Sequence, residues 1–329
     1  MRQTYIILCV LFTLIGCSSE AEFAPELKTP VGFGVNVDQT KGSLALSKDQ
    51  VLSMGVFSLY TEMPFPVAGY ARQMENILVH RPDKDKVFTY SPISYWPESG
   101  YLCFFAYSPF ASQDNGIQSP RLTSEGFMQL DFQPVTEVSK QIDLMAAVNL
   151  NRQRNTQMVD LPLKHILSAV QFKGSTSVVT SDYKVRVKEI QLTNLINKGT
   201  FTYSAAATAG WQLDSKVKQS FTLSIADKTL LDVSLTETPV GLVNSETALM
   251  ILPQEILAGE LHLKAKLEIT ESGKVSNKDI DIDLFDLLNR FTISRKYILT
   301  LSHETGSKVK VSYEVVDWDK KIIDIPSFN

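Results

Sequence analysis

Apolar and polar residues alternate along most of this chain, with a period of two. Val31, Phe33, Val35 and Val37 alternate with small or polar residues. The pattern recurs in further segments, at 185–190, 221–225, 231–235, 261–269, 280–284, 297–301 and 309–315. This period places one face of a strand in a core and the other in water. Short strands separated by Gly, Pro, Asn and Ser predict an all-β fold of antiparallel sandwiches.

Three apolar segments do not follow this alternation. Ile142 to Leu150 and Leu284 to Arg290 could each form a short helix instead. Tyr101 to Tyr107 is apolar throughout, which predicts a buried strand. We expect Cys103 and Phe105 to lie on opposite faces of that strand, with the thiol buried and inert.

The N-terminus predicts export and lipidation. Arg2 precedes an apolar run from Tyr5 to Ile15, which is too short for a membrane span of about 20 residues. The run ends in Gly16 and Cys17, which is similar to the bacterial lipobox, where a cysteine thiol receives lipid. We therefore predict a lipoprotein signal peptide at 1–16, removed by the signal peptidase for lipoproteins, and a lipidated tether at 17–30. The acyl chains on Cys17 would hold the protein on a membrane.

Length and composition predict a folded protein of two domains. The chain has 329 residues, of which 44% are hydrophobic and 21% charged. Residues 151–160 are mostly polar, so we place the domains at 31–157 and 158–329. The net charge of -4, without a basic stripe, argues against a nucleic-acid partner.

Residues that could carry chemistry show no catalytic pattern. The four histidines have no metal-ligand spacing, and His165 lies in a strand-like segment that predicts a structural hydrogen bond. Asp279, Asp281 and Asp283 should line one strand face, where they could bind calcium, but the glycine and distal glutamate of an EF-hand loop are missing. No nucleophile elbow is present. We expect no enzyme, no cofactor and no metal.

Four stretches resemble one known family. They are Tyr95 to Pro109, which contains Tyr-Trp-Pro and Phe-Phe-Ala-Tyr, Leu161 to Phe172, Ile190 to Tyr203 with Trp211, and Leu249 to Gln254 with Val316 to Trp318. With the lipobox, they span nearly the whole chain. On these motifs the chain resembles a fimbrillin-family lipoprotein of the Bacteroidetes, the group that includes type V pilus subunits.

The resemblance implies two transthyretin-like antiparallel β-sandwich domains in tandem and a location on the outer membrane, exposed at the cell surface. It also implies a role as a fimbrial (pilus) subunit or as an anchor or accessory subunit. Its partners would be other fimbrial subunits, which supply a strand after a protease removes the first strand. The alternative is a surface adhesin or glycan-binding lipoprotein with the same fold, in which aromatic rings stack on sugars. The candidate rings are Tyr95, Trp96, Trp211 and Trp318.

Val31, Phe33, Val35 and Val37 form the candidate detachable strand, and Lys41 follows it where the family's protease site would fall. No arginine occurs between Cys17 and Arg72, although the known pilus-maturing proteases prefer arginine. The chain could therefore be cut at Lys41, or it could stay whole as an anchor or accessory subunit. Ile323 and Ile325 could belong to a donor strand or to a plain terminal strand.

Overall fold

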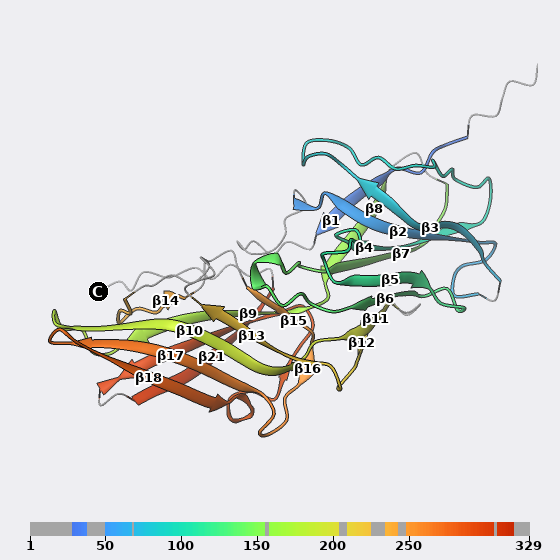
Figure 1. The fold of residues 1–329 in the computed structure, drawn as a ribbon. Coiled ribbons are helices and arrows are strands. Elements are labelled where there is room, and N and C mark those ends of the chain that lie inside the picture. Colours follow the sequence, from blue (N-terminus) through green and yellow to red (C-terminus); the bar gives the residue numbers. More distant parts are fainter. Residues whose placement is uncertain are drawn as a thin grey trace, which may run out of the picture.

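The structure is a computed structural model of the 329-residue chain. It describes residues 28–37, 50–67, 69–154, 158–203, 209–224, 234–242, 248–305 and 308–318. Figure 1 shows two lobes, each built from layers of β-sheet. No α-helix occurs in these ranges, and 3₁₀ turns are found at Val138–Lys140 and Leu284–Asp286.

The N-terminal lobe is built on a six-stranded sheet in the order β1-β8-β7-β4-β2-β3. Its strands are β1 (Phe33–Val37), β2 (Ser53–Thr61), β3 (Ala71–His80), β4 (Tyr101–Ser108), β7 (Met145–Arg152) and β8 (Val159–His165). All neighbours are antiparallel except β1 and β8, which run parallel. Apolar residues cover both faces of β4, because each face of this sheet packs against a separate core.

A four-stranded sheet in the order β12-β11-β6-β5 covers one face of the six-stranded sheet. Its strands are β5 (Ile117–Leu122), β6 (Met128–Phe132), β11 (Gly199–Tyr203) and β12 (Ala209–Leu213). The apolar residues between these two sheets, which include Phe57, Phe105, Leu130 and Phe201, form what we call the inner core.

The outer core lies on the other face of the six-stranded sheet. Phe33, Val56, Phe104 and Leu161 contribute to it from four strands, and Trp96 covers it from the connection between β3 and β4. Each of these side chains is at most 5% exposed. The central strands β2 and β4 are therefore buried on both faces, whereas the edge strand β3 is largely exposed.

The C-terminal lobe is a sandwich of two sheets, in the orders β13-β10-β17-β18 and β14-β9-β20-β21. Its strands are β9 (Ser168–Thr176), β10 (Tyr183–Ile196), β13 (Lys218–Ser224), β14 (Val240–Gly241), β15 (Leu249–Ile251), β17 (His262–Glu271), β18 (Lys274–Asp283), β20 (Arg295–Glu304) and β21 (Lys308–Asp317), with a small separate sheet of β16 (Gln254–Glu255) and β19 (Arg290–Phe291). β15 pairs with β9, which runs parallel to β20. One apolar cluster, including Phe172, Leu263 and Leu299, fills the space between the sheets.

The all-β prediction of tandem sandwiches is confirmed, and two local predictions are wrong. The segment that could have been a helix at 142–150 contributes β7. The range 284–290 forms a short 3₁₀ turn at Leu284–Asp286 and ends at the first residue of β19. Cys103 and Phe105 lie on the same face of β4, in the inner core, because residues two apart in a strand point the same way.

Backbone pairing does not follow a simple division of the sequence at residue 157. β8 lies beyond that point yet pairs with β1 and β7 in the N-terminal sheet. The hairpin of β11 and β12 also lies beyond it, and β11 pairs with β6 (Figure 1). Strands that follow residue 157 therefore complete both N-terminal sheets, which joins the two lobes through several chain crossings.

Candidate functional site at the N-terminal edge strand

β1 forms one edge of the six-stranded sheet. It runs parallel to β8 in a register that places Phe33 opposite Val159 and Val37 opposite Leu163. Five residue pairs align β1 with β8, whereas two pairs align β7 with β8. β1 is therefore aligned with β8 over more residue pairs than β7 is.

The apolar face of β1 is buried in the outer core. Val31, just before the strand, is 2% exposed, and Phe33 is 3% exposed. The Phe33 ring lies edge-on to two others, with centroids 5.4 Å from Tyr90 and 5.7 Å from Phe104. Removal of β1 would leave these aromatic residues facing an unfilled space.

The structure covers only part of the predicted site. Val35 packs against the outer core and is partly buried. The side chain of Val37 lies outside what the structure describes, and so do Cys17 and Lys41. The detachability of the strand, the lipid site and the cleavage site therefore stay predictions.

A short lead-in segment also ties the N-terminus to the connection between β3 and β4. Val31 N donates to Ser94 O at 2.9 Å, and Trp96 N donates to Thr29 O at 2.9 Å. The Tyr90 hydroxyl donates to Val31 O at 2.7 Å. Burial raises the pKa of Tyr90, so it stays a neutral donor. Residues 29–31 are thus held by hydrogen bonds outside the sheet.

A cavity of about 330 Å³ opens beside this lead-in segment. We call it the aromatic cavity, and its lining includes Tyr60, Tyr95, Trp96, Lys28, Glu98 and Arg154. Tyr95 is 43% exposed and Trp96 is 5% exposed. Of the four rings considered for sugar stacking, these two therefore lie together.

The other two candidate rings, Trp211 and Trp318, make structural contacts within the fold. The indole Nε1 of Trp211 donates to Ile166 O at 2.6 Å, and the ring packs against the inner core. Trp318 is 2% exposed and stacks on His165. His165 also contacts Asp143, so its predicted structural hydrogen bond is present.

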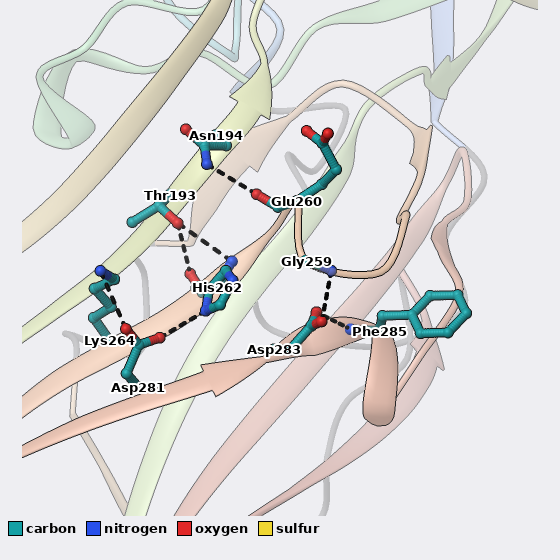
Figure 2. A network of polar contacts seen from close by, with 9 residues as sticks. All are labelled: Thr193, Asn194, Gly259, Glu260, His262, Lys264, Asp281, Asp283 and Phe285. Carbon is teal, nitrogen blue, oxygen red and sulfur yellow. Dashed lines mark hydrogen bonds and ion pairs between the residues drawn. The ribbon is translucent and has the colours of Figure 1, made fainter.

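The aspartate row of β18 faces basic groups and backbone amides. Asp281 lies 2.7 Å from His262 Nδ1 and 3.2 Å from Lys264 Nζ, both on the neighbouring β17 (Figure 2). The hydrogen bond from His262, helped by Lys264, holds the pKa of Asp281 below its usual value. Asp281 is thus engaged by two side chains of the same sheet.

Asp283 acts at the end of β18. Its carboxylate accepts the backbone N–H groups of Gly259 at 2.7 Å and Phe285 at 2.9 Å (Figure 2). It therefore caps the 3₁₀ turn that begins at Leu284. The pKa of Asp283 is lowered by these backbone hydrogen bonds.

Across the described ranges, no three His, Cys, Asp or Glu side chains gather as a group that could hold a metal ion. Within the same ranges, no helix has both the length and the apolar character that a bilayer span needs.

Sequence reasoning missed most of the cavity lining. Tyr60 lies near the end of β2, Arg154 follows β7 and Lys28 precedes β1, so their separations in sequence carry no motif. The alternation pattern alone predicts for Tyr60 only a position near the end of a strand. The pairing of the strands brings these residues together.

Comparison with solved structures gives relatives with the same fold. A fimbrial protein from Bacteroides vulgatus ATCC 8482 is 17% identical, with a TM-score of 0.66 over 87% of this chain and 99% of that one. A candidate cell adhesion protein from Bacteroides uniformis ATCC 8492 is 16% identical, with a TM-score of 0.53 over 88% and 98% of the two chains. Another from Bacteroides ovatus ATCC 8483 is 14% identical, with a TM-score of 0.51 over the same shares. At such identities the likeness concerns the fold alone.

Among proteins with curated descriptions, none matches this chain. A family model described as fimbrillin-like matches residues 49–318, which is most of the sequence and includes every strand from β2 to β21. The chain therefore belongs to the fimbrillin-like family.

Proposed function

We propose that this protein is a lipid-anchored surface subunit of a fimbria, either polymerising or anchoring, which assembles by β-strand addition at the position of β1. Family membership supports a fimbrial or adhesive role at the cell surface. One observation supports strand addition above all: β1 is an edge strand whose apolar face fills the outer core.

The position of β1 in the chain suits it to exchange. β1 is the first strand and lies at the edge, so its departure removes no other strand and breaks no connection between the remaining ones. The exposed edge of β8 would then lack backbone partners, and the outer core would lack Val31 and Phe33. An incoming strand with alternating apolar residues would supply both.

The N-terminal features fit the same scheme. A lipid on Cys17 would hold the precursor on the outer membrane. Lys41 lies between β1 and β2 in sequence, so cleavage after it would leave β1 attached by non-covalent contacts alone. An uncut chain would keep β1 in place and act as an anchor or accessory subunit.

The test compares a chain of residues 18–329 with a chain of residues 42–329. Burial of Val31 and Phe33 contributes about 1.5–3 kcal/mol each, before chain entropy is subtracted. We therefore expect the shorter chain to be an unstable monomer or to form chains linked by strand exchange. Size-exclusion chromatography with light scattering and thermal unfolding distinguish these outcomes.

A chain of residues 28–329 is the matched control, because it lacks the tether but keeps β1. It should have the melting temperature and size of the 18–329 chain. If the 42–329 chain stays monomeric and melts with the control, β1 is not an exchangeable part of the core.

The lipid part is tested separately. Cys17→Ser should move the protein from the membrane fraction to the soluble fraction of the cell envelope, because no acyl chain can be added. Full retention of Cys17→Ser in membranes would disprove the anchor at this residue.

A further inference from the structure

The aromatic cavity has the size and lining of a small-molecule site. Its volume of about 330 Å³ falls at the lower end of the roughly 300–1,000 Å³ typical of ligand pockets. Tyr60, Tyr95 and Trp96 bring three rings to it from two separate parts of the chain. Rings of this kind offer flat apolar faces with negative charge above the plane, against which C–H groups of a ligand pack.

Tyr95 is exposed, although the next residue in the sequence is buried. It is 43% exposed, whereas its neighbour Trp96 is buried in the outer core. The backbone around both residues is held by the bridge between Pro30 and Tyr95 and by the bond from Trp96 N to Thr29 O. Tyr95 is thus an exposed lining residue whose backbone is held in place.

Two buried polar atoms of the lining lack hydrogen-bond partners in the part of the chain that the structure describes. They are the donor Nε1 of Trp96 and the acceptor Oε1 of Gln73. Nε2 of Gln73 donates to Ser94 Oγ at 2.8 Å and to Tyr95 O at 2.7 Å. Since a carbonyl oxygen can only accept, this orientation of the amide is fixed. Unpaired buried polar atoms are costly, but both atoms are shielded from solvent, so they are not themselves open to a ligand in the cavity.

Charged side chains complete the lining. Glu98 supplies a carboxylate, and Lys28 and Arg154 supply N–H donors, all three at exposed positions. The Nη2 atom of Arg154 also donates to Thr29 Oγ1 at 3.1 Å. Neighbouring hydroxyl groups on one ring can donate to a carboxylate and accept from a guanidinium together.

From these features we infer that the aromatic cavity binds a saccharide ring, and that Lys28, at the start of the segment 28–31, forms part of its wall. A pyranose offers a C–H face for Tyr95 and hydroxyl groups for the polar lining. Binding in the intact chain does not depend on strand exchange. The second part rests on the proposed function, because loss of the segment with β1 would remove Lys28 from the lining and Thr29, which accepts a hydrogen bond from Arg154. A sugar would then bind the uncut subunit and stabilise β1 in its own chain by mass action.

Saturation-transfer NMR on the 18–329 chain tests the site, with glucose, N-acetylglucosamine and glucuronate as probes at millimolar concentration. Binding of at least one sugar is expected, and binding of glucuronate alone would assign the cations as the main determinant. Tyr95→Ala should weaken binding by about tenfold or more. Ile93→Ala is the matched control, because Ile93 is 49% exposed nearby and does not line the cavity.

The proposal is overturned if none of the three sugars gives a signal, or if Tyr95→Ala binds as well as the unmodified chain. Far-ultraviolet circular dichroism checks that both variants are folded. The role of the wall is tested in the full chain with Lys28→Ala combined with Thr29→Val, which should also weaken binding. Unchanged affinity in that double variant would disprove the contribution of the segment 28–31 to the site. All these binding measurements use the chain that keeps β1. A failure of strand exchange in the 42–329 chain would therefore not change them.

Discussion

Trp318 stacks face to face on His165, with ring centroids 4.8 Å apart and an interplanar angle of 13°. Trp318 follows β21 of the C-terminal lobe, whereas His165 ends β8 of the N-terminal sheet. The Nδ1 atom of His165 lies 2.9 Å and 2.8 Å from the two carboxylate oxygens of Asp143. The indole belongs to the inner core. The last described residue of the chain therefore fastens the C-terminal lobe to the N-terminal one.

Trp318→Ala should destabilise the protein by about 3–5 kcal/mol, because it leaves a cavity the size of an indole in the inner core. We also expect the two lobes to unfold in separate steps, since this contact couples them. Urea unfolding followed by fluorescence and by circular dichroism measures both effects. Tyr313→Ala, at an exposed position of β21, is the control and should change little. A Trp318→Ala protein with an unchanged midpoint would contradict the role of this contact.

Gly55 and Tyr107 lie opposite each other in β2 and β4, and a Cβ atom at Gly55 would overlap the Tyr107 ring. Gly55→Ala should therefore cost about 1–3 kcal/mol through overpacking. In a double-mutant cycle with Tyr107→Ala, the Gly55→Ala penalty should largely disappear, because the obstructing ring is gone. Simple additivity of the two penalties would show that the ring does not occupy this space.

Burial raises the pKa of Tyr107 to about 12, although hydrogen bonds from Ala111 N and with Asn76 lower it in part. In the unfolded chain the phenol has a pKa of about 10. The neutral phenol thus stabilises the fold below pH 10, and this contribution is lost as the pH rises from 10 to 12. The loss is on the order of 3 kcal/mol. Tyr107→Phe should flatten this part of the stability curve, and an equally steep decline in that variant would assign it to other groups.

The strands could be predicted from local sequence because alternation reports one buried face. Val31 to Val37 contains β1, and the segment 261–269 lies almost wholly within β17. The family could be predicted as well, since its motifs lie in the strands and in the connection that packs on them. The helix alternative for 142–150 was wrong because a short apolar run has no readable period. The wrong faces for Cys103 and Phe105 came from a miscount, since a period of two already puts them together.

The choice of sheet for each strand could not be predicted. Phe201 and Tyr203 alternate as in any half-buried strand, and nothing local indicates that they join β6 in the other lobe. The aromatic cavity could not be predicted either, because its lining comes from segments that are far apart in the sequence. Tyr60 and Tyr95, for instance, come from β2 and from the connection before β4.

Asp281→Asn should change stability by less than about 1 kcal/mol, because the contacts of Asp281 with His262 and Lys264 are solvent-exposed. Calcium should not raise the melting temperature of either protein, since the carboxylate already faces basic groups. Differential scanning calorimetry with calcium and with a chelator measures this. A calcium-dependent rise that Asp281→Asn abolishes would instead establish a calcium site on β18.

Phe33→Ala should loosen β1 while leaving the rest of the protein folded. Phe33 is 3% exposed and meets Tyr90 and Phe104 edge-on, so its truncation should cost about 3–5 kcal/mol. That cost falls on an edge strand, so β1 should detach before the sheet unfolds. The amide of Val159, which donates to Gly32 O at 2.7 Å, should then exchange its hydrogen faster. Hydrogen exchange measured by NMR tests this, with partly buried Val35→Ala as the milder control on the same strand. If exchange at Val159 were equally slow in Phe33→Ala and the unmodified chain, β1 would be held by contacts other than its aromatic anchor, and an exchanging strand would have no reason to carry a large ring at this position.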